Sequence, residues 1–302
     1  MSPKTVFVTG CRDGSAGSAL ALEFHSRGYR VFATTTDGSR MSSLESHQNM
    51  TTLELDVTSQ ASIDMASSKV RHAIAAESDG KAPHLDILVS NAAIFKTMPL
   101  ADIKLEDGRK IFEANFFGVL AVTQAFLPLL RSASADDRNG GHIVNVSSIS
   151  ATMCPPWQGM YASSKAALLA MSHVMRLELA PFGVSVTVVM SGGVETAGIR
   201  ESHQQNEKLP GDSLYRILAP SIETNERGRN FKGTDATDYA KQVVNEVLAS
   251  RSKPMTWKGA FSWVAWVLSW LGWVGMMDKG QIDGHGLNKL YLSTEKISVK
   301  EE

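Results

Sequence analysis

The sequence predicts an α/β protein with a doubly wound parallel sheet of about seven strands, and three stretches carry this prediction. Residues 4–24, KTVFVTGCRDGSAGSALALEF, have the pattern of a strand, a glycine-rich turn and a helix, which is typical of the phosphate-binding opening of a dinucleotide fold. GHIVNVSSIS, at 141–150, is an apolar strand that ends in serines, and a long helical run containing Tyr161 follows it. Together these stretches predict a Rossmann-type single domain.

Length, charge and cysteine content restrict the class of protein. At 302 residues the chain can form one domain with a large core. Its formal net charge of −1, without a basic stripe, predicts no nucleic-acid partner. Cys11 and Cys154 form neither a disulfide framework nor a metal-ligand set, so we expect no metal and a reducing compartment. The first strand leaves no room for a cleaved signal peptide, which predicts a cytoplasmic protein that is not secreted.

The glycine-rich turn after the first strand is the expected phosphate-binding site. Gly10, Gly14 and Gly17 punctuate this turn, with Ser15 between the last two, and SALALEFHSRGY continues as a helix. Glycine permits positive φ and close approach of the backbone to a phosphate. The helix N-terminus adds amide donors and the positive end of its dipole.

The end of the second strand, RVFATT at 30–35, is where a dinucleotide fold selects its cofactor. An acidic residue there binds the ribose hydroxyls of NAD, whereas an arginine accommodates the 2′-phosphate of NADP. Thr36 and Asp37 follow the strand, and Arg12 and Arg40 could supply positive charge. Asp37 is compatible with NAD or with a turn-forming role, and the arginines with NADP or with a solvated surface. We favour NADPH/NADP over NAD.

Polar residues also end the third and fourth predicted strands. TTLELDV, at 51–57, contains Asp56, and Ser59 is available to cap a helix over 60–77. LDILVSNAA, at 85–93, carries Asn91 near its carboxyl end. Open α/β sheets bind ligands at the carboxyl ends of their strands. Asp56 and Asn91 are therefore candidates for the cofactor site, and the alternative for Asp56 is a helix cap.

A long helix is predicted over about 105–133, with Asn115 in its middle. An asparagine inside a helix lowers helix propensity because its side chain competes for backbone hydrogen bonds. Asn115 therefore has either a functional role or the role of a buried amide bonded to backbone.

Tyr161 and Lys165 lie four residues apart in MYASSKAALLAMSHVMRLELA, a run with helical apolar spacing. Their side chains should share one face of that helix. A phenol has a pKa of about 10 and is a weak proton donor near neutral pH. An ammonium beside it favours the phenolate and lowers that pKa, so the pair can act as a tuned acid and base. Taken alone, the spacing more commonly means a core tyrosine and a solvated lysine.

The loop at 151–160 precedes this helix, and Met153 and Trp157 are expected either to line a substrate pocket or to pack on the scaffold. A sixth strand is predicted at 183–190 and a capped helix over 234–250. KPMTWKG, at 253–259, is expected to be a short edge strand.

Residues 259–277 contain no charge, and Trp263, Trp266, Trp270 and Trp273 recur at spacings of three and four. On a helix these tryptophans share one face. Tryptophan prefers membrane interfaces, which favours association of 259–277 with a membrane surface. Packing over the active site or against a second subunit has equal weight. A true span ranks below both, because nineteen uncharged residues are marginal for crossing a bilayer.

These motifs resemble those of the short-chain dehydrogenases/reductases over about residues 4–258. Within that family the chain is most similar to the fungal 1-acyldihydroxyacetone-phosphate reductases, which share the TGC-type turn and a Trp-rich tail. Ser15 and Ala93 stand where the wider family usually has glycine, and Ser191 where it usually has proline. The matching pieces are TGCRDGSAG, LELDVTS, SNAA at 90–93, EANFFG, Ser148, and Tyr161 with Lys165.

The resemblance implies catalytic roles for four residues. Tyr161 would donate a proton to a substrate carbonyl, and Ser148, preferred over Ser147, would polarise that carbonyl. Lys165 would lower the Tyr161 pKa and bind the nicotinamide ribose. Asn115 would bend its helix and hold a water in a proton relay to Lys165.

The resemblance also implies a cofactor-binding set. Asp56 would contact the adenine amine, and Thr196 would hydrogen-bond the nicotinamide carboxamide. The full expected set is Gly10, Arg12, Gly14, Ser15, Gly17, Thr36, Asp56, Asn91, Tyr161, Lys165, Val194 and Thr196.

The same resemblance implies a domain organisation. Residues 1–258 would form the catalytic domain, with a mobile substrate lid at about 197–232, and 259–302 would form a Trp-rich extension. Leu214, Tyr215, Ile217 and Leu218 of the lid would either face the substrate or anchor a short helix. We also expect a homo-oligomer, either a dimer or a tetramer.

We therefore expect an NADP-preferring oxidoreductase that acts on C=O or CH–OH groups of a small hydrophobic molecule, such as a lipid, steroid, polyketide or terpenoid. One alternative is a redox-neutral cyclase, epimerase or dehydratase, which the altered turn and Thr36 would permit. Another is a non-catalytic, membrane-associated binding protein, which the complete Ser/Tyr/Lys set disfavours. A membrane-binding tail would place the protein at the surface of the endoplasmic reticulum or a lipid droplet.

Overall fold

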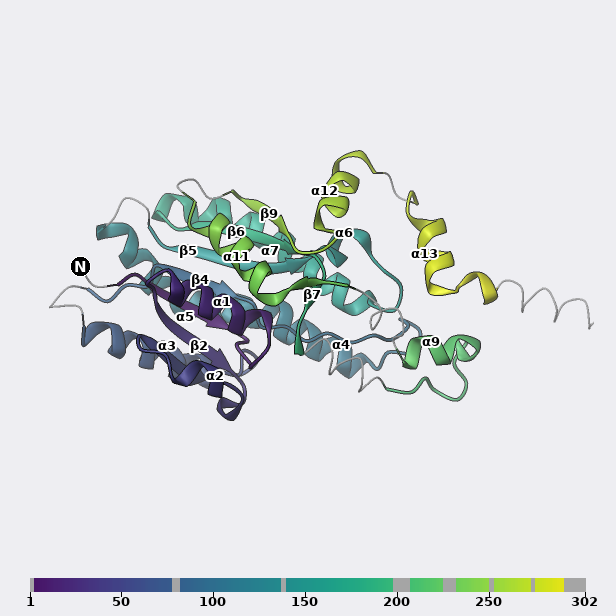
Figure 1. Cartoon of the computed structure of the whole chain (residues 1–302), viewed down its shortest axis with the longest axis horizontal. Coiled ribbons are helices and arrows are strands. Elements are labelled where there is room, and N and C mark those ends of the chain that lie inside the picture. Colours follow the sequence, from purple (N-terminus) through teal and green to yellow (C-terminus); the bar gives the residue numbers. More distant parts are fainter. Residues whose placement is uncertain are drawn as a thin grey trace, which may run out of the picture.

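In the computed structural model, residues 3–77, 82–136, 140–197, 207–224, 232–249, 253–272 and 275–290 are described. Within these ranges, seven parallel strands form one sheet in the order β3-β2-β1-β4-β5-β6-β9 (Figure 1). The order reverses between β1 and β4, which confirms the predicted doubly wound topology. The strands are β1 (Thr5–Thr9), β2 (Arg30–Thr35), β3 (Met50–Glu54), β4 (Ile87–Ser90), β5 (His142–Ser148), β6 (Ser185–Ser191) and β9 (Met255–Lys258).

Helices cover both faces of this sheet, and a short parallel pair of strands, β7 (Val194–Glu195) and β8 (Thr234–Asp235), lies outside it. α1 packs against α11 on one face, and α3, α5 and α7 pack on the other. The helices are α1 (Ala16–Ser26), α2 (Ser42–Glu45), α3 (Gln60–Ala75), α4 (Leu105–Phe112), α5 (Gly118–Asp136), α6 (Ser150–Met153), α7 (Gly159–Leu179), α9 (Ala219–Glu223), α11 (Ala236–Val247), α12 (Ser262–Leu271) and α13 (Asp278–His285).

Alternating side chains of the central strands fill two separate cores. Val6 and Val8 of β1 belong to the core beneath α1 and α11. Phe7, between them, belongs to the core beneath α3, α5 and α7, where its ring lies 4.3 Å from that of Phe126. Because both faces are covered, β1 and β5 are buried along their whole length, as strands of an enclosed parallel sheet are.

The structure corrects three predicted boundaries. β3 ends at Glu54, so Asp56 lies beyond the strand. The predicted loop at 151–160 begins with the helical turn α6 and ends inside α7. The predicted helix at 105–133 is interrupted by a π-helical segment, Glu113–Phe117, whose last turn pairs the Gly118 amide with the Glu113 carbonyl.

The carboxyl-terminal extension forms two helices: α12 lies near α6 and β9, and α13 lies at the end of the molecule where α9 is found (Figure 1). α12 has ten residues and rises about 15 Å, half the thickness of a bilayer core, so it does not form a membrane span. Trp263, Trp266 and Trp270 are all exposed on it, and Trp273 lies outside the described residues. The run Leu105–Ser132 is long and apolar enough to cross a membrane, but half of it is buried within the protein.

Candidate active site

A cleft of about 2590 Å³ opens at the carboxyl ends of the strands. Gly10, which follows β1, and Asn91, which follows β4, both line it. The cleft therefore lies at the topological switch point, where open α/β sheets bind their ligands. Its volume exceeds the range of about 300–1,000 Å³ that is usual for one small molecule, so it has room for a dinucleotide and a substrate.

The glycine-rich turn has the backbone geometry that its sequence predicts. Gly10 and Gly14 have φ of 76° and 70°, a region that is open to glycine and strained for other residues. A Cβ on Gly17 would lie 2.2 Å from the Gly10 carbonyl oxygen. Gly10 and Ser15 line the cleft, whereas Gly14 and Gly17 shape the turn behind it.

Ser15 caps α1 and thereby keeps the turn intact. Its Oγ accepts a hydrogen bond from the Ser18 amide at 3.1 Å and donates one to the Gly10 carbonyl at 3.0 Å. The N-terminus of α1 therefore meets the cleft beside a glycine turn that admits close backbone approach. Helix amides and a positive dipole end suit an anion, so these residues fit a pyrophosphate.

The structure distinguishes between the two interpretations of the charged residues near the end of β2. Arg12, Thr36 and Arg40 line the cleft. Asp37 does not line it. Its Oδ1 accepts from the amide and the hydroxyl of Ser39, at 3.1 and 2.6 Å, and so caps the turn Gly38–Arg40. The turn-forming interpretation of Asp37 is therefore the one that the structure supports.

Asp56 lies two residues after β3, and Asn91 directly follows β4. Both line the cleft. Ser59 caps α3 by accepting from the Ser62 amide, so Asp56 is not that helix's cap; its Oδ1 instead accepts from the Thr58 amide and hydroxyl at 2.9 and 2.7 Å. The side-chain Nδ2 of Asn91 donates hydrogen bonds to the Thr9 and Gly10 carbonyls at 3.0 and 3.3 Å. These bonds connect the end of β4 to the glycine turn.

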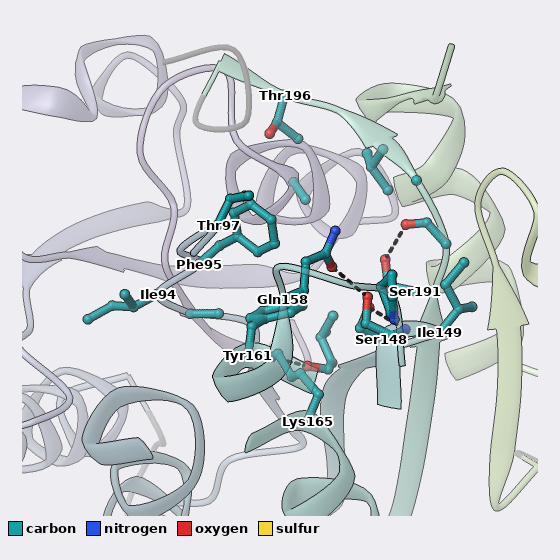
Figure 2. Close-up of a pocket in the computed structure, with 18 of the residues that line it drawn as sticks. Ile94, Phe95, Thr97, Ser148, Ile149, Gln158, Tyr161, Lys165, Ser191 and Thr196 are labelled. Carbon is teal, nitrogen blue, oxygen red and sulfur yellow. Dashed lines mark hydrogen bonds between the residues drawn. The ribbon is translucent and has the colours of Figure 1, made fainter. Parts of the chain in front are cut away.

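Ser148, Tyr161 and Lys165 come together at the centre of the cleft (Figure 2). Lys165 is buried, and its Nζ donates to the Val146 carbonyl at 2.8 Å. Ser147 also lines the cleft, but its Oγ is engaged in a hydrogen bond that it donates to the Lys165 carbonyl at 2.9 Å. Ser148 is the serine that forms a hydrogen bond with Tyr161, in agreement with the preference for Ser148 over Ser147.

Burial shifts the pKa values of both Tyr161 and Lys165. Burial raises the pKa of Tyr161, and a hydrogen bond with Ser148 lowers it in part. Burial also lowers the pKa of Lys165 to about 8. The Lys165 ammonium lies 5.9 Å from the Tyr161 ring centroid and is turned toward the Val146 carbonyl. In the protein alone, burial therefore sets the direction of the Tyr161 pKa shift, and the lowering by Lys165 stays a prediction.

Asn115 is fully buried in the π-helical segment, and its side chain joins two parts of the site. Its Oδ1 accepts from the Ile94 amide at 2.7 Å, and its Nδ2 donates to the Ile94 carbonyl at 2.9 Å and to Ser164 Oγ at 3.0 Å. Ser164 directly precedes Lys165. This geometry gives the side chain a positioning role, and the water relay stays a prediction.

Val194 and Thr196 both line the cleft, next to the glycine turn. The amide of Ala197 donates to the Gly14 carbonyl at 2.9 Å. The segment after β6 therefore stands against the phosphate-binding turn, where the predicted contact with a nicotinamide would require it.

Gln158 and Tyr239 are among the cleft residues that the sequence did not indicate. Gln158, one helical turn before Tyr161, accepts from Ser150 Oγ at 3.1 Å and lies beside Ser148 in Figure 2. Tyr239 of α11 is fully buried and lines the cleft, and burial raises its pKa to about 12. A helical spacing relative to Tyr161 could have indicated Gln158, but nothing local marks Tyr239, which is 78 residues from Tyr161.

The substrate side differs most from expectation. Met153 and Trp157 line the cleft as predicted. The four apolar residues predicted for the lid do not line it: Leu214 and Ile217 are exposed, and Leu218 is buried in a small core that Tyr215 contacts. Ile222 of α9 takes their place at the cleft, as do residues of α13. Residues 198–206 and 225–231 of the predicted lid lie outside the described residues.

The described cysteines and acidic residues provide no metal centre. Cys11 is buried, which raises its thiol pKa to about 12, and Cys154 is exposed. Within the described ranges, no group of three or more His, Cys, Asp or Glu side chains could hold a metal ion.

Comparison with known proteins agrees with this geometry. The family model for short chain dehydrogenases matches residues 4–207. Short-chain dehydrogenase PC-15 of Penicillium crustosum is 40% identical over 271 residues, which cover 89% of this chain and 93% of that protein. An NADPH-dependent 1-acyldihydroxyacetone phosphate reductase of Schizosaccharomyces pombe is 40% identical over 193 residues, covering 64% of this chain and 60% of that protein.

A solved structure carries the same fold. The short chain dehydrogenase from Burkholderia cenocepacia, in complex with NADP, superposes with a TM-score of 0.66 at 25% identity, covering 89% of this chain and 93% of that one. The resemblance predicted from the sequence is confirmed: this chain belongs to the short-chain dehydrogenase family of NAD(P)-dependent oxidoreductases.

Proposed function

We propose that this protein is an NADPH-dependent carbonyl reductase, or in reverse an alcohol dehydrogenase, of small hydrophobic molecules. The observation that carries the proposal is the convergence of Ser148, Tyr161 and Lys165 beside a glycine turn that admits a pyrophosphate. The dependence of the related fission-yeast reductase on NADPH supports the choice of cofactor, as does the NADP held by the Burkholderia protein.

The residues present fit a dinucleotide along the whole cleft. The turn from Gly10 to Gly17 and the α1 N-terminus would hold the pyrophosphate. Arg12 and Arg40 would take a 2′-phosphate beside Thr36, Asp56 would lie by the adenine, and Val194 and Thr196 would lie by the nicotinamide. When bound, the nicotinamide supplies the hydride.

Residues of the protein would donate the proton and stabilise the negative charge that develops on the carbonyl oxygen. Tyr161 would donate its phenolic proton to the carbonyl oxygen, and Ser148 would donate a hydrogen bond to the same oxygen. Because Ser148 already accepts from the Ser150 amide at 3.1 Å, its own proton is directed elsewhere, and the cleft is one available direction. Lys165, held by the Val146 carbonyl, places a cation beside the phenol and would favour its ionised product form.

The apolar character of the substrate side supports a hydrophobic substrate. Phe95 lies edge-on to the Tyr161 ring, with centroids 4.9 Å apart. Ile94, Met153, Trp157 and Ile222 line the cleft around this centre. Such walls favour burial of apolar substrate surface.

The direct test is a fluorescence titration of the purified protein with NADPH and NADH, followed by NADPH consumption with a panel of ketones and aldehydes. Selective binding of NADPH and carbonyl-dependent oxidation of NADPH are expected. Product formation without net NADPH oxidation would instead indicate a redox-neutral enzyme. If neither nucleotide binds, the redox proposal is wrong.

A further inference from the structure

The far end of the cleft is built from three segments that are remote in sequence. The loop after α6 contributes Trp157, α9 contributes Ile222, and the carboxyl-terminal extension contributes Gln281 and His285. The extension is therefore part of the wall of the cleft. Its remaining cleft residues are Phe261, Val264, Asp283, Gly284, Gly286, Asn288 and Lys289.

Trp157 is held at the centre of this wall in a strained backbone conformation. Its φ is 69°, a left-handed value that costs a bulky residue of this kind free energy. The Trp157 carbonyl accepts from the Met98 amide at 2.7 Å, which fixes the loop. Strain of this kind persists where the surrounding structure enforces it and is common at ligand-binding positions.

Two aromatic side chains hold the Trp157 ring from different segments. Tyr215 lies edge-on to it, with ring centroids 5.1 Å apart, and His285 of α13 does so at 6.3 Å. His285 is oriented by its own helix, because its Nδ1 donates to the Gln281 carbonyl at 2.9 Å. The position of the Trp157 ring therefore depends on both the described part of the lid and the extension.

The extension is also packed against the same region by apolar and polar contacts. Leu287 and Leu290 pack against the small core that contains Leu218 and Ile222. The Gln281 side-chain amide donates to the Met153 carbonyl at 3.3 Å. Residues 281–290 are thus attached to the rest of the protein at two places, the end of α6 and the small core beside α9.

We infer that Trp157, α9 and α13 form a distal substrate subsite, which accepts an elongated carbonyl compound that is apolar along its middle and ends at the polar residues of α13. This inference rests on the proposed function for the position of the reacting carbonyl. Trp157 and Ile222 bury the apolar part, while Asp283, Asn288 and Lys289 are exposed at the rim and meet the polar end. Affinity for long substrates is therefore set by the extension, and the chemistry is set by Tyr161.

The test compares the binding of nonan-2-one and butan-2-one to the full-length enzyme saturated with NADP⁺, through displacement of 1-anilinonaphthalene-8-sulfonate. Five additional methylenes should give the wild-type enzyme at least a tenfold lower Kd for nonan-2-one, since each buried methylene is favourable. His285→Ala and Leu287→Asp should each reduce this preference by about tenfold. Lys279→Ala is the matched control, because Lys279 lies exposed on α13 outside the cleft lining, and it should keep the preference.

An unchanged NADPH Kd in each variant establishes that the catalytic domain is folded. The inference is overturned if wild-type enzyme binds both ketones equally, or if the preference survives in both His285→Ala and Leu287→Asp. Failure of the proposed function has a different signature: nonan-2-one would bind with the expected preference, but no carbonyl in the panel would oxidise NADPH.

Discussion

The two sides of the cleft are assembled in different ways. The cofactor side consists of residues that directly follow strands, such as Gly10 after β1 and Asn91 after β4, and hydrogen bonds between neighbouring strand ends hold them. The substrate side consists of Trp157, α9 and α13, which belong to loops and to the carboxyl-terminal extension. The sheet positions the residues of the cofactor side, whereas contacts between segments remote in sequence position the residues of the substrate side. Chemistry and specificity can therefore vary independently in this chain.

The largest effect should come from removing the proposed proton donor, Tyr161, which lies between the two sides. Tyr161→Phe deletes the phenolic hydroxyl and should lower turnover by about 10³-fold, within the range for general acid catalysis. The Kd for NADPH should change little, because the glycine turn is untouched. Single-turnover reduction and fluorescence titration measure the two quantities. Turnover that survives in Tyr161→Phe would refute the assignment of the acid.

On the cofactor side, a substitution of Gly17 should weaken NADPH binding most strongly. In Gly17→Ala the new Cβ would lie 2.2 Å from the Gly10 carbonyl oxygen and 2.6 Å from Asn91 Nδ2, so the turn must move. We expect the Kd for NADPH to rise by about 100-fold, in keeping with roughly 3 kcal/mol of lost fit.

Gly211→Ala is the control for this change, because a Cβ there meets no atom within 4 Å. Its Kd for NADPH should equal that of the wild type. Equal Kd values for Gly17→Ala and Gly211→Ala would contradict the role given to the turn.

The buried lysine predicts a pH dependence of stability. Burial lowers the pKa of Lys165 from 10.5 to about 8, so between these values the unfolded chain holds a proton that the folded protein has lost. Stability from this group therefore rises with pH across that window and is constant below it. Relative to Lys165→Met, the free energy of unfolding of wild type should increase by about 2 kcal/mol from pH 8 to pH 9.5.

Urea unfolding at both pH values measures this difference, and titration of other groups cancels between the two proteins. Parallel pH curves for wild type and Lys165→Met would show that the pKa of Lys165 is not lowered in the fold.

The smallest effect should come from substitutions that change the preference between NADPH and NADH. Arg40→Ala should weaken NADPH by about tenfold and leave NADH unchanged, as expected for loss of a charge-assisted contact with a 2′-phosphate. Asp37→Ala should leave the NADPH to NADH ratio within about twofold, because Asp37 caps a turn through Ser39. A shift toward NADPH in Asp37→Ala would restore Asp37 as the selector.

Sequence alone predicted most of the cofactor side and the catalytic centre. Gly10, Ser148, Tyr161 and Lys165 are recognisable because their spacing along the chain is the spacing of strand ends and helical turns. The same local logic explains why β2 was predicted to the residue. The direction of the Tyr161 pKa shift, in contrast, depends on burial, which is a property of the folded core.

The sequence predicted the order of strands, turns and helices along the chain, and with it the family, and it pointed to Ser148, Tyr161 and Lys165 as candidate reacting residues. The folded structure was needed to see that Asp37 is not part of the cleft lining, that Leu214 and Ile217 face solvent, and that α13 lines the substrate side. The physical reason is that periodicity reports which face of an element is buried, but not which distant element buries it. Contacts such as that between Trp157 and His285 join segments more than a hundred residues apart, and no local pattern specifies them.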